Sequence, residues 1–136
     1  MTIKIITDST SDLSEQAIKE YGIAVIPCFI NLDGKSYLDG VELSRAEFYN
    51  RLPGWSNPPT TSAPSPGMFI ETYQTAIDDG STGIFSIHTS DQLSNMINVA
   101  RIAALSLQSR SSIFTKPHPN SSFRFRPTHH GNRIIS

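Results

Sequence analysis

The sequence predicts an α/β fold, a largely parallel sheet with helices on both faces. Short apolar segments typical of buried strands occupy residues 3–6, 23–26 and 83–87. Between and after them lie segments whose apolar residues recur every three to four positions, as in amphipathic helices. Strands that alternate with helices in this way are typical of parallel sheets. The length of 136 residues suits a single domain.

The first strand is followed by a polar segment and then by a helix. Asp12 and Glu15 have the spacing of a capping box, and Gly22 is a typical helix stop. Asp8 and Ser9 therefore lie after the carboxyl end of the first strand, where open α/β sheets bind their ligands. Either they contribute to a binding site, or they only close the turn and cap the helix.

A hairpin is expected after the second strand. Apolar segments at 29–32 and 36–38 flank Asp33-Gly34, a pair that suits a type I′ turn. Cys28 is the single cysteine, which excludes an intrachain disulfide and a cysteine-based zinc site. Since it lies between apolar residues, we expect it to pack inertly in the core.

Two further helix starts can be placed. Ser44 and Glu47 form a capping box, and Ser65-Pro66 has the pattern of an N-cap followed by the first helical residue. Residues 58–66 hold four prolines and four hydroxyl residues, so this segment is expected to be extended and stiff, neither helix nor strand. Hydroxyls before a helix N-terminus suit a small anion. The alternative is an ordinary proline-rich loop with one helix cap.

His88 follows the third core strand and precedes a long amphipathic helix. Ser90 or Asp91 is expected to cap this helix, which places Ser94 in its first turn. His88, Asp91 and Ser94 supply the residue types of a hydrolase triad. They are confined to one loop and the next helical turn, and no nucleophile elbow surrounds Ser94. A serine hydrolase is therefore not expected, and His88 is interpreted as a structural residue at a strand end.

The composition changes at residue 109. Residues 1–108 carry six basic and twelve acidic side chains, whereas residues 109–136 carry five basic and no acidic ones. No period of 2 or 3.6 holds for long in this basic, Pro- and Ser-rich tail, so we expect it to be poorly ordered. We expect neither a metal site from its histidines nor a function for its alternating Phe and Arg residues, although these could touch RNA or a membrane surface. The residues are His118, His129, His130, Phe123, Arg124, Phe125 and Arg126.

Several classes of function find no support in the sequence. It contains no P-loop, G-x-G-x-x-G, G-x-S-x-G or H-E-x-x-H pattern, so no motif indicates a nucleotide or a metal-dependent reaction. An acidic body argues against nucleic-acid binding. No signal peptide is visible, and no apolar run approaches the ~20 residues of a membrane helix. We therefore expect a soluble cytoplasmic protein with no transmembrane segment, metal or cofactor.

Four segments resemble the DegV family of bacterial lipid-binding proteins. The first is similar to the opening signature of the family, and the second to its Ile-Pro and Asp-Gly motifs. The third resembles its T-S-x-P-S motif, and the fourth the segment that usually reads L-S-G-T-Y. They are residues 7–13, 26–40, 61–65 and 87–100. Four similarities in the right order make the resemblance specific for residues 1–108.

The resemblance implies that residues 1–108 are an N-terminal domain that binds one long-chain fatty acid. The acyl chain would lie in an apolar tunnel, and the carboxylate would meet hydroxyl groups, which can donate to it. The residues concerned are Thr61, Ser62 and Ser94, with Asp8, Ser9 and His88 as supporting residues. Since some proteins of the family present the fatty acid to a separate fatty acid kinase, the resemblance implies a carrier and not an enzyme.

The chain departs from the family pattern in two places. Asn95-Met96-Ile97 stands where the family usually has Gly-Thr-Tyr after Leu-Ser. The resemblance stops near residue 108, where the family continues with a further strand and a second domain that completes the tunnel. A frameshift or a truncated gene would account for this change. The alternative function is accordingly a truncated fragment that binds no lipid, or a protein-interaction module that uses the exposed apolar face.

Overall fold

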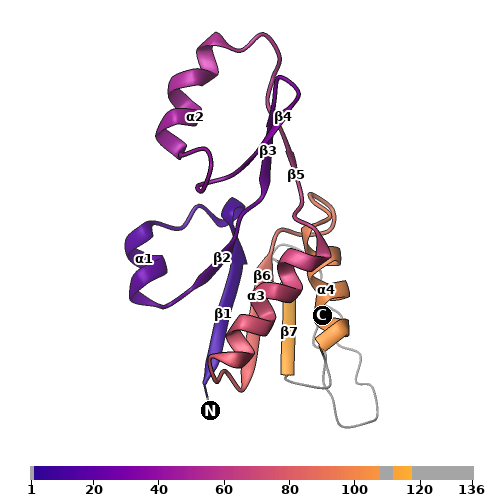
Figure 1. Ribbon diagram of the computed structural model, residues 1–136. Coiled ribbons are helices and arrows are strands. Elements are labelled where there is room, and N and C mark those ends of the chain that lie inside the picture. Colours follow the sequence, from indigo (N-terminus) through magenta and orange to yellow (C-terminus); the bar gives the residue numbers. More distant parts are fainter. Residues whose placement is uncertain (1, 108–111, 118–136) are drawn as a thin grey trace.

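The computed structural model describes residues 2–107 and 112–117. Its strands form a four-stranded parallel sheet and a three-stranded antiparallel sheet (Figure 1). In chain order the elements are β1 (Ile3–Asp8), the 3₁₀-helix η1 (Ser9–Ser11), α1 (Glu15–Glu20), β2 (Ala24–Ile26), β3 (Phe29–Leu32), β4 (Lys35–Leu38), α2 (Arg45–Arg51), the 3₁₀-helix η2 (Leu52–Gly54), β5 (Thr60–Ser62), α3 (Pro66–Asp78), β6 (Gly83–His88), α4 (Met96–Leu107) and β7 (Ser112–Pro117).

The parallel sheet has the strand order β2-β1-β6-β7 and helices on both faces, which confirms the predicted fold class. Helix α3 contacts β2 and β6, α4 contacts β6 and β7, and the two helices pack against each other. Ala24 and Ile26 of β2 face this helix pair. Val25 points the opposite way and lines a hollow together with Ile18 of α1, so α1 lies on the other face.

The main core lies between the parallel sheet and the pair of helices α3 and α4. It is apolar, and three of the residues that α4 contributes are alanines, which lets α4 approach the sheet closely. Its buried members are Ile6, Ile26, Cys28, Phe69, Tyr73, Ala76, Ile84, Met96, Val99, Ala100, Ala103, Ala104, Leu107 and Ile113. Cys28 thus packs in the core, as predicted. The opposite face is less well covered, because Ile3 and Ile5 of β1 are 55% and 37% exposed.

The predicted hairpin is present as β3 and β4. Asp33 and Gly34 both have positive φ, of 46° and 78°, as a type I′ turn requires. The antiparallel sheet has the order β4-β3-β5. A second, smaller core beside α2 holds the buried residues Ile30, Leu32 and Leu43 with Tyr37, Phe48 and Trp55 packed around them.

Of the four predicted helix starts, those of α2 and α3 are confirmed, and that of α1 is wrong. Ser44 and Glu47 form a complete capping box, and Ser65 caps α3 with Pro66 at its first position. The expected cap of the first helix at Asp12 is wrong, since Asp12 has a left-handed φ of 57°. Ser14 has the extended backbone of an N-cap, and its hydroxyl accepts a hydrogen bond from the Ala17 amide instead.

Residues 58–66 contain a strand that the sequence analysis did not predict. Thr60–Ser62 pairs with β3 in an antiparallel register, with Thr61 opposite Ile30. Prolines flank this tripeptide but do not enter it, so its amides remain able to join a ladder. The expectation of a segment without a strand is therefore wrong for these three residues.

The start of α4 also differs from the expectation. The carbonyl of Ser90 accepts hydrogen bonds from the Leu93 and Ser94 amides, which closes a separate turn before the helix. Helix α4 begins at Met96, so Ser90 and Asp91 do not cap it. Ser94 precedes the helix, and its hydroxyl accepts a hydrogen bond from the Met96 amide at 3.3 Å.

Part of the tail belongs to the folded domain. Ser112–Pro117 forms β7, which pairs in parallel with β6 from Gly83↔Ser112 to His88↔Pro117. Ile113 and Thr115 are buried on one face of the strand. The expectation of poor order is wrong for these six residues, because their short alternation becomes a strand once β6 supplies the partner. Residues 118–136, with the histidines and the Phe and Arg residues named above, lie outside the described residues.

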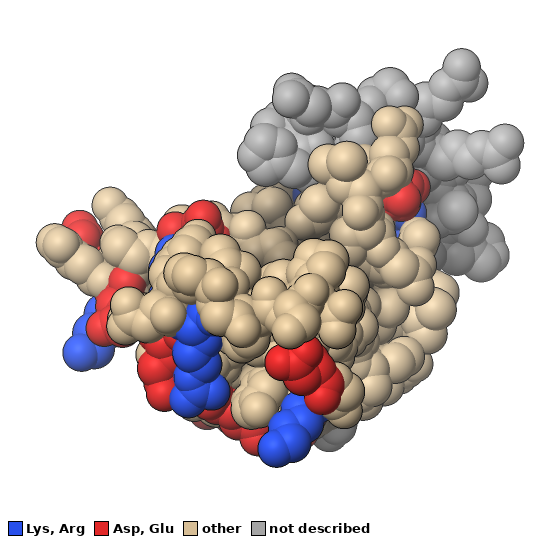
Figure 2. Space-filling view, turned by 90° about the horizontal axis from the view of Figure 1, so that it is seen from above, with Lys and Arg blue, Asp and Glu red and all other residues tan. Residues whose placement is uncertain are grey.

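Charged side chains of both signs are mixed on the surface that carries α2 and the β3–β4 hairpin. Figure 2 shows acidic and basic groups next to each other on this face, beside wide areas without charge. Two ion pairs involve α2: Arg45 to Asp12 at 2.6 Å and Arg51 to Glu47 at 3.4 Å. Exposed pairs of this kind contribute little to stability. Among the helices of residues 2–107, none is long and apolar enough to cross a membrane.

The assignment of β7 can be tested by truncating its buried side chain. Ile113 is 2% exposed, and replacing a buried isoleucine with alanine costs about 2–5 kcal/mol. We expect Ile113→Ala to lower the free energy of unfolding by that amount in urea denaturation. Ser112→Ala, at an exposed position of the same strand, should change it by less than about 0.5 kcal/mol. Equal effects of the two variants would show that residues 112–117 do not pack against β6.

Candidate functional site

The candidate site lies where β1 and β6 separate at the carboxyl edge of the parallel sheet. The two strands pair from Ile3↔Gly83 to Ile6↔Ser86. Beyond that point β1 continues its pairing with β2, and β6 continues with β7. The chain then leaves β1 toward α1 on one face and β6 toward α4 on the other. This is a topological switch point, the position at which open α/β sheets bind ligands.

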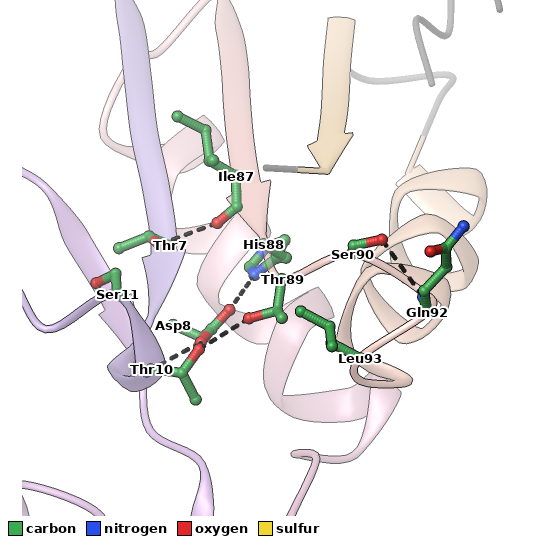
Figure 3. A pocket seen from close by; sticks show the side chains of 10 residues that line it. All are labelled: Thr7, Asp8, Thr10, Ser11, Ile87, His88, Thr89, Ser90, Gln92 and Leu93. Atoms are coloured by element: carbon green, nitrogen blue, oxygen red, sulfur yellow. Dashed lines mark hydrogen bonds and ion pairs between the residues drawn. The ribbon is translucent and has the colours of Figure 1, made fainter. Parts of the chain in front are cut away.

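A hollow of about 440 Å³ opens at this point (Figure 3). Its volume falls within the usual range for small-molecule sites. It is lined mainly by polar side chains from the ends of β1 and β6 and from the segments that follow them. These are Thr7, Asp8, Thr10, Ser11, Ile87, His88, Thr89, Ser90, Gln92 and Leu93. Leu93 stands at its rim and is 83% exposed.

A buried chain of hydrogen bonds runs from α3 to this hollow. The Tyr73 hydroxyl lies 2.8 Å from Ser86 Oγ, which lies 2.6 Å from His88 Nε2. His88 Nδ1 lies 2.6 Å from Asp8 Oδ2. If each group donates toward Asp8, every donor and acceptor along the chain is satisfied by a neutral imidazole with its proton on Nδ1. All four side chains are buried, so this matching removes the cost of unpaired polar groups.

The carboxyl group of Asp8 is held in its charged form. Burial alone would raise its pKa, but hydrogen bonds from His88 and from Thr10 bring the pKa below its ordinary value. Both the amide and the hydroxyl of Thr10 donate to Asp8 Oδ1. At the other end of the chain, burial raises the pKa of Tyr73, which keeps its hydroxyl protonated and able to donate.

Three hydrogen bonds made by side chains continue the contact of β1 with β6 beyond the end of their backbone pairing. The Thr7 hydroxyl donates to the Ile87 carbonyl at 2.9 Å. Asp8 bonds to His88, as described, and the hydroxyls of Thr10 and Thr89 lie 3.1 Å apart (Figure 3). Since the Thr10 hydroxyl donates to Asp8, Thr89 is the donor in this last link.

Ser9 and Cys28 lie behind the site. The Ser9 hydroxyl accepts a hydrogen bond from the Cys28 amide at 3.0 Å, so it ties the end of β1 to the chain after β2. The Cys28 thiol lies 4.0 Å from Asp8 Oδ1. Burial and the nearby Asp8 charge raise the pKa of this thiol, which keeps it protonated.

The sequence-predicted residues fall into two groups. Asp8 and His88 are in direct contact and line the hollow, with Ser9 behind them. Thr61, Ser62 and Ser94 are not among the described residues that line it. Thr61 and Ser62 are exposed on β5, where Ser62 Oγ accepts a hydrogen bond from Asn31 at 3.3 Å, and Ser94 is half-buried. Their contact with a ligand stays a prediction.

The hydrolase triad considered in the sequence is not assembled. His88 bonds to Asp8 and Ser86, while Asp91 lies 3.8 Å from Arg101. Asp8, His88 and Ser86 have the order of a triad, but Ser86 is 0% exposed and already bonded to Tyr73, so no substrate can reach it. In residues 2–107 and 112–117, no group of three or more His, Cys, Asp or Glu residues could hold a metal ion.

Sequence reasoning missed four residues, namely Thr10 and Thr89, which line the hollow, and Tyr73 and Ser86, which are buried in the core behind it and do not line it. Of these four, only Ser86 could have been identified from the sequence pattern. It precedes His88 by two positions in a strand, so both side chains must point to the same face of the sheet. The other three depend on which strands are neighbours.

Comparisons with known proteins agree with this fold. A model of the family described as "Uncharacterised protein, DegV family" matches residues 2–116. A DegV domain-containing protein of Clostridium perfringens is 41% identical over 107 residues, which are 79% of this chain and 38% of that protein. The chain thus spans about two fifths of the length of this relative and of one from Deinococcus radiodurans.

Solved structures show the same similarity. A DegV family protein from Thermus thermophilus, reported for its fatty-acid binding, is 34% identical with a TM-score of 0.72, covering 83% of this chain and 40% of that one. A stearic acid-binding protein from Eubacterium ventriosum is 27% identical with a TM-score of 0.75, covering 85% of this chain and 41% of that one.

The charge of Asp8 predicts a specific dependence of stability on pH. Its pKa is lower in the folded state than in the unfolded state, so the carboxylate stabilises the fold above the unfolded value of about 3.9. This stabilisation is lost as the pH falls through the folded pKa. Asp8→Asn removes a hydrogen-bonded charge and should cost about 1.5–3 kcal/mol at pH 7. The difference from wild type should shrink toward pH 2.

The measurement is the free energy of unfolding in urea between pH 7 and pH 2. His88 and the Cys28 thiol, the titratable groups that contact Asp8, are present in both proteins. Asp33→Asn, at an exposed turn position, is the control for replacing a carboxyl group with an amide. A constant difference between wild type and Asp8→Asn over this range would contradict the prediction.

Proposed function

Because the chain belongs to the DegV family, we propose that it binds a long-chain fatty acid. The observation that carries the proposal is the likeness to solved structures of fatty-acid-binding proteins, at 34% and 27% identity. The switch point between β1 and β6 supports it, because it opens a hollow beside hydroxyl-rich segments. The proposed role is that of a cytoplasmic carrier without a reaction of its own, which presents the fatty acid to a fatty acid kinase.

In this proposal the hydroxyls of Thr61, Ser62 and Ser94 bind the carboxylate. Thr61 and Ser62 are exposed at the edge of the antiparallel sheet, and Ser94 lies before the first turn of α4. Each can donate a hydrogen bond to a carboxylate, worth roughly 1.5–3 kcal/mol. The acyl chain would lie in an apolar tunnel, where each buried CH₂ contributes about 0.8 kcal/mol.

The hollow beside Asp8 suits a carboxylate less well than these three hydroxyls. Asp8 lines it as an anion, and the protons of the Thr7 and Thr10 hydroxyls are donated to protein oxygens. These groups therefore present lone pairs to the hollow, and a second carboxylate there would be repelled. Asp8, Ser9 and His88 support the site from behind and do not donate to the ligand.

A second candidate function is that of a protein-interaction module or a fragment that binds no lipid. Parallel sheets are normally covered on both faces, yet Ile3 and Ile5 leave an apolar surface open on β1. Recovery of the purified chain without lipid, in a stable complex with another protein, would favour this alternative.

The carboxylate site can be tested by native mass spectrometry with stearic acid. Wild type should retain one fatty acid, and Thr61→Ala and Ser94→Ala should each weaken binding about 10- to 100-fold, the equivalent of one hydrogen bond to a charged group. Thr75→Ala and Ser106→Ala are matched controls, because both hydroxyls are exposed on helices and bond only to the helix backbone. A folded wild type that retains no fatty acid would contradict the proposal, as would binding unchanged in both site variants.

A further inference from the structure

The end of the contact between β1 and β6 carries an unusual set of bonds. After Ile6 and Ser86 no backbone pair joins the two strands, and the links that remain are made by side chains. The central one joins Asp8 to His88, two residues that are 80 positions apart and nearly inaccessible to solvent. It therefore fixes the segment after β6 against the segment after β1.

His88 also reaches the second segment of the proposed carboxylate site. Its ring packs edge to face on Phe69, with the ring centroids 5.2 Å apart. Phe69 lies in the first turn of α3, which Ser65 caps, and Ser62 precedes that cap by three residues. In the other direction, His88 is followed directly by the turn at residues 89–95, which carries Ser94. One side chain thus contacts α3 and anchors the 89–95 turn.

Stability alone does not account for a buried pair of a carboxylate and an imidazole at this place. Removing a carboxylate from water costs several kcal/mol, and well-packed apolar residues in place of such a pair are often as stabilising or more so. The neighbouring Ile6 and Ile84 show that apolar side chains fit this layer of the core. A hydrogen-bonded pair differs from an apolar contact in that it fixes the orientation of both partners.

We infer that Asp8 and His88 are positioning residues that hold the 89–95 turn, and with it the Ser94 hydroxyl, in place for the fatty-acid carboxylate. The inference rests on the proposed function. The hydrogen bond between the hydroxyls of Thr10 and Thr89 also holds the turn, because Thr89 is its first residue. None of these four residues is assigned a bond to the ligand.

The test combines hydrogen exchange with ligand binding on the full 136-residue chain. In the free protein, His88→Gln should speed amide exchange of residues 89–95 about 10-fold, because the turn loses its anchor. The same variant should weaken the binding of stearic acid about 10-fold, as expected for a misplaced contact group. Tyr73→Phe is the control, because it removes the far end of the buried chain and leaves the Asp8–His88 bond intact.

Each outcome decides for or against the inference. Tyr73→Phe should change exchange of the turn and binding less than about 2-fold, even where it lowers overall stability. If the amides of residues 89–95 exchange equally fast in His88→Gln and Tyr73→Phe, compared at equal free energies of unfolding, the inference is overturned. If His88→Gln fails to fold, Thr89→Val gives the same test without disturbing the buried charge, and it should speed exchange of the turn about 3-fold. Unchanged exchange in Thr89→Val would then overturn it.

The failure of the inference and that of the proposed function are distinguishable. Exchange is measured without ligand, so it reports on the anchor whether or not the chain binds lipid. If wild type does not bind stearic acid, the proposed function fails and the exchange data still decide whether His88 holds the turn. If wild type binds and His88→Gln binds equally well, the positioning role fails while the proposed function stands.

Discussion

The bond between Asp8 and His88 is the interaction on which the arrangement of the site depends. A carboxylate and an imidazole are buried together, at 2.6 Å, at the edge of an otherwise apolar core. The carboxylate would be costly there without its partner, because an unpaired buried charge destabilises a fold by several kcal/mol. The pair forms only if β1 and β6 are neighbours in the register that places Ile6 opposite Ser86. The need to pair these two buried polar side chains thus favours one strand order and one register.

The same register creates the hollow. While β1 and β6 are paired, backbone hydrogen bonds join them and their side chains alternate between the two faces of the sheet. Once β1 stays with β2 and β6 with β7, the neighbouring strands part, and their connections go to α1 and α4 on opposite faces. The gap is bridged by the side chains of Thr7, Asp8 and Thr10. Binding geometry at a switch point is therefore a consequence of the topology, and the residues at strand ends decide what it can bind.

Local patterns in the sequence were sufficient to predict most of the helices and strands. Apolar spacing located the central strands, and Ser44 with Glu47 and Ser65 with Pro66 marked helix starts, because caps act within four residues. The two strands that were not predicted needed distant partners: β5 pairs with β3, and β7 with β6. The residues of the site show the same difference between local patterns and contacts of distant segments. Asp8 and His88 could be placed at strand ends, but their contact across 80 positions could not be read from local patterns.

In the proposed function, the orientation of a fatty acid and the affinity for it have different sources. Hydroxyls on the described residues can orient a carboxylate, but the affinity for a long acyl chain must come from apolar burial, at about 0.8 kcal/mol per CH₂. Two aliphatic residues, Ile87 and Leu93, line the hollow, and Leu93 is mostly exposed. In the proposed function the acyl chain would also use apolar surface outside the hollow, and Ile3 and Ile5 of β1 are exposed apolar side chains. The head-group chemistry and the strength of binding are consequently separable, and a variant that loses one need not lose the other.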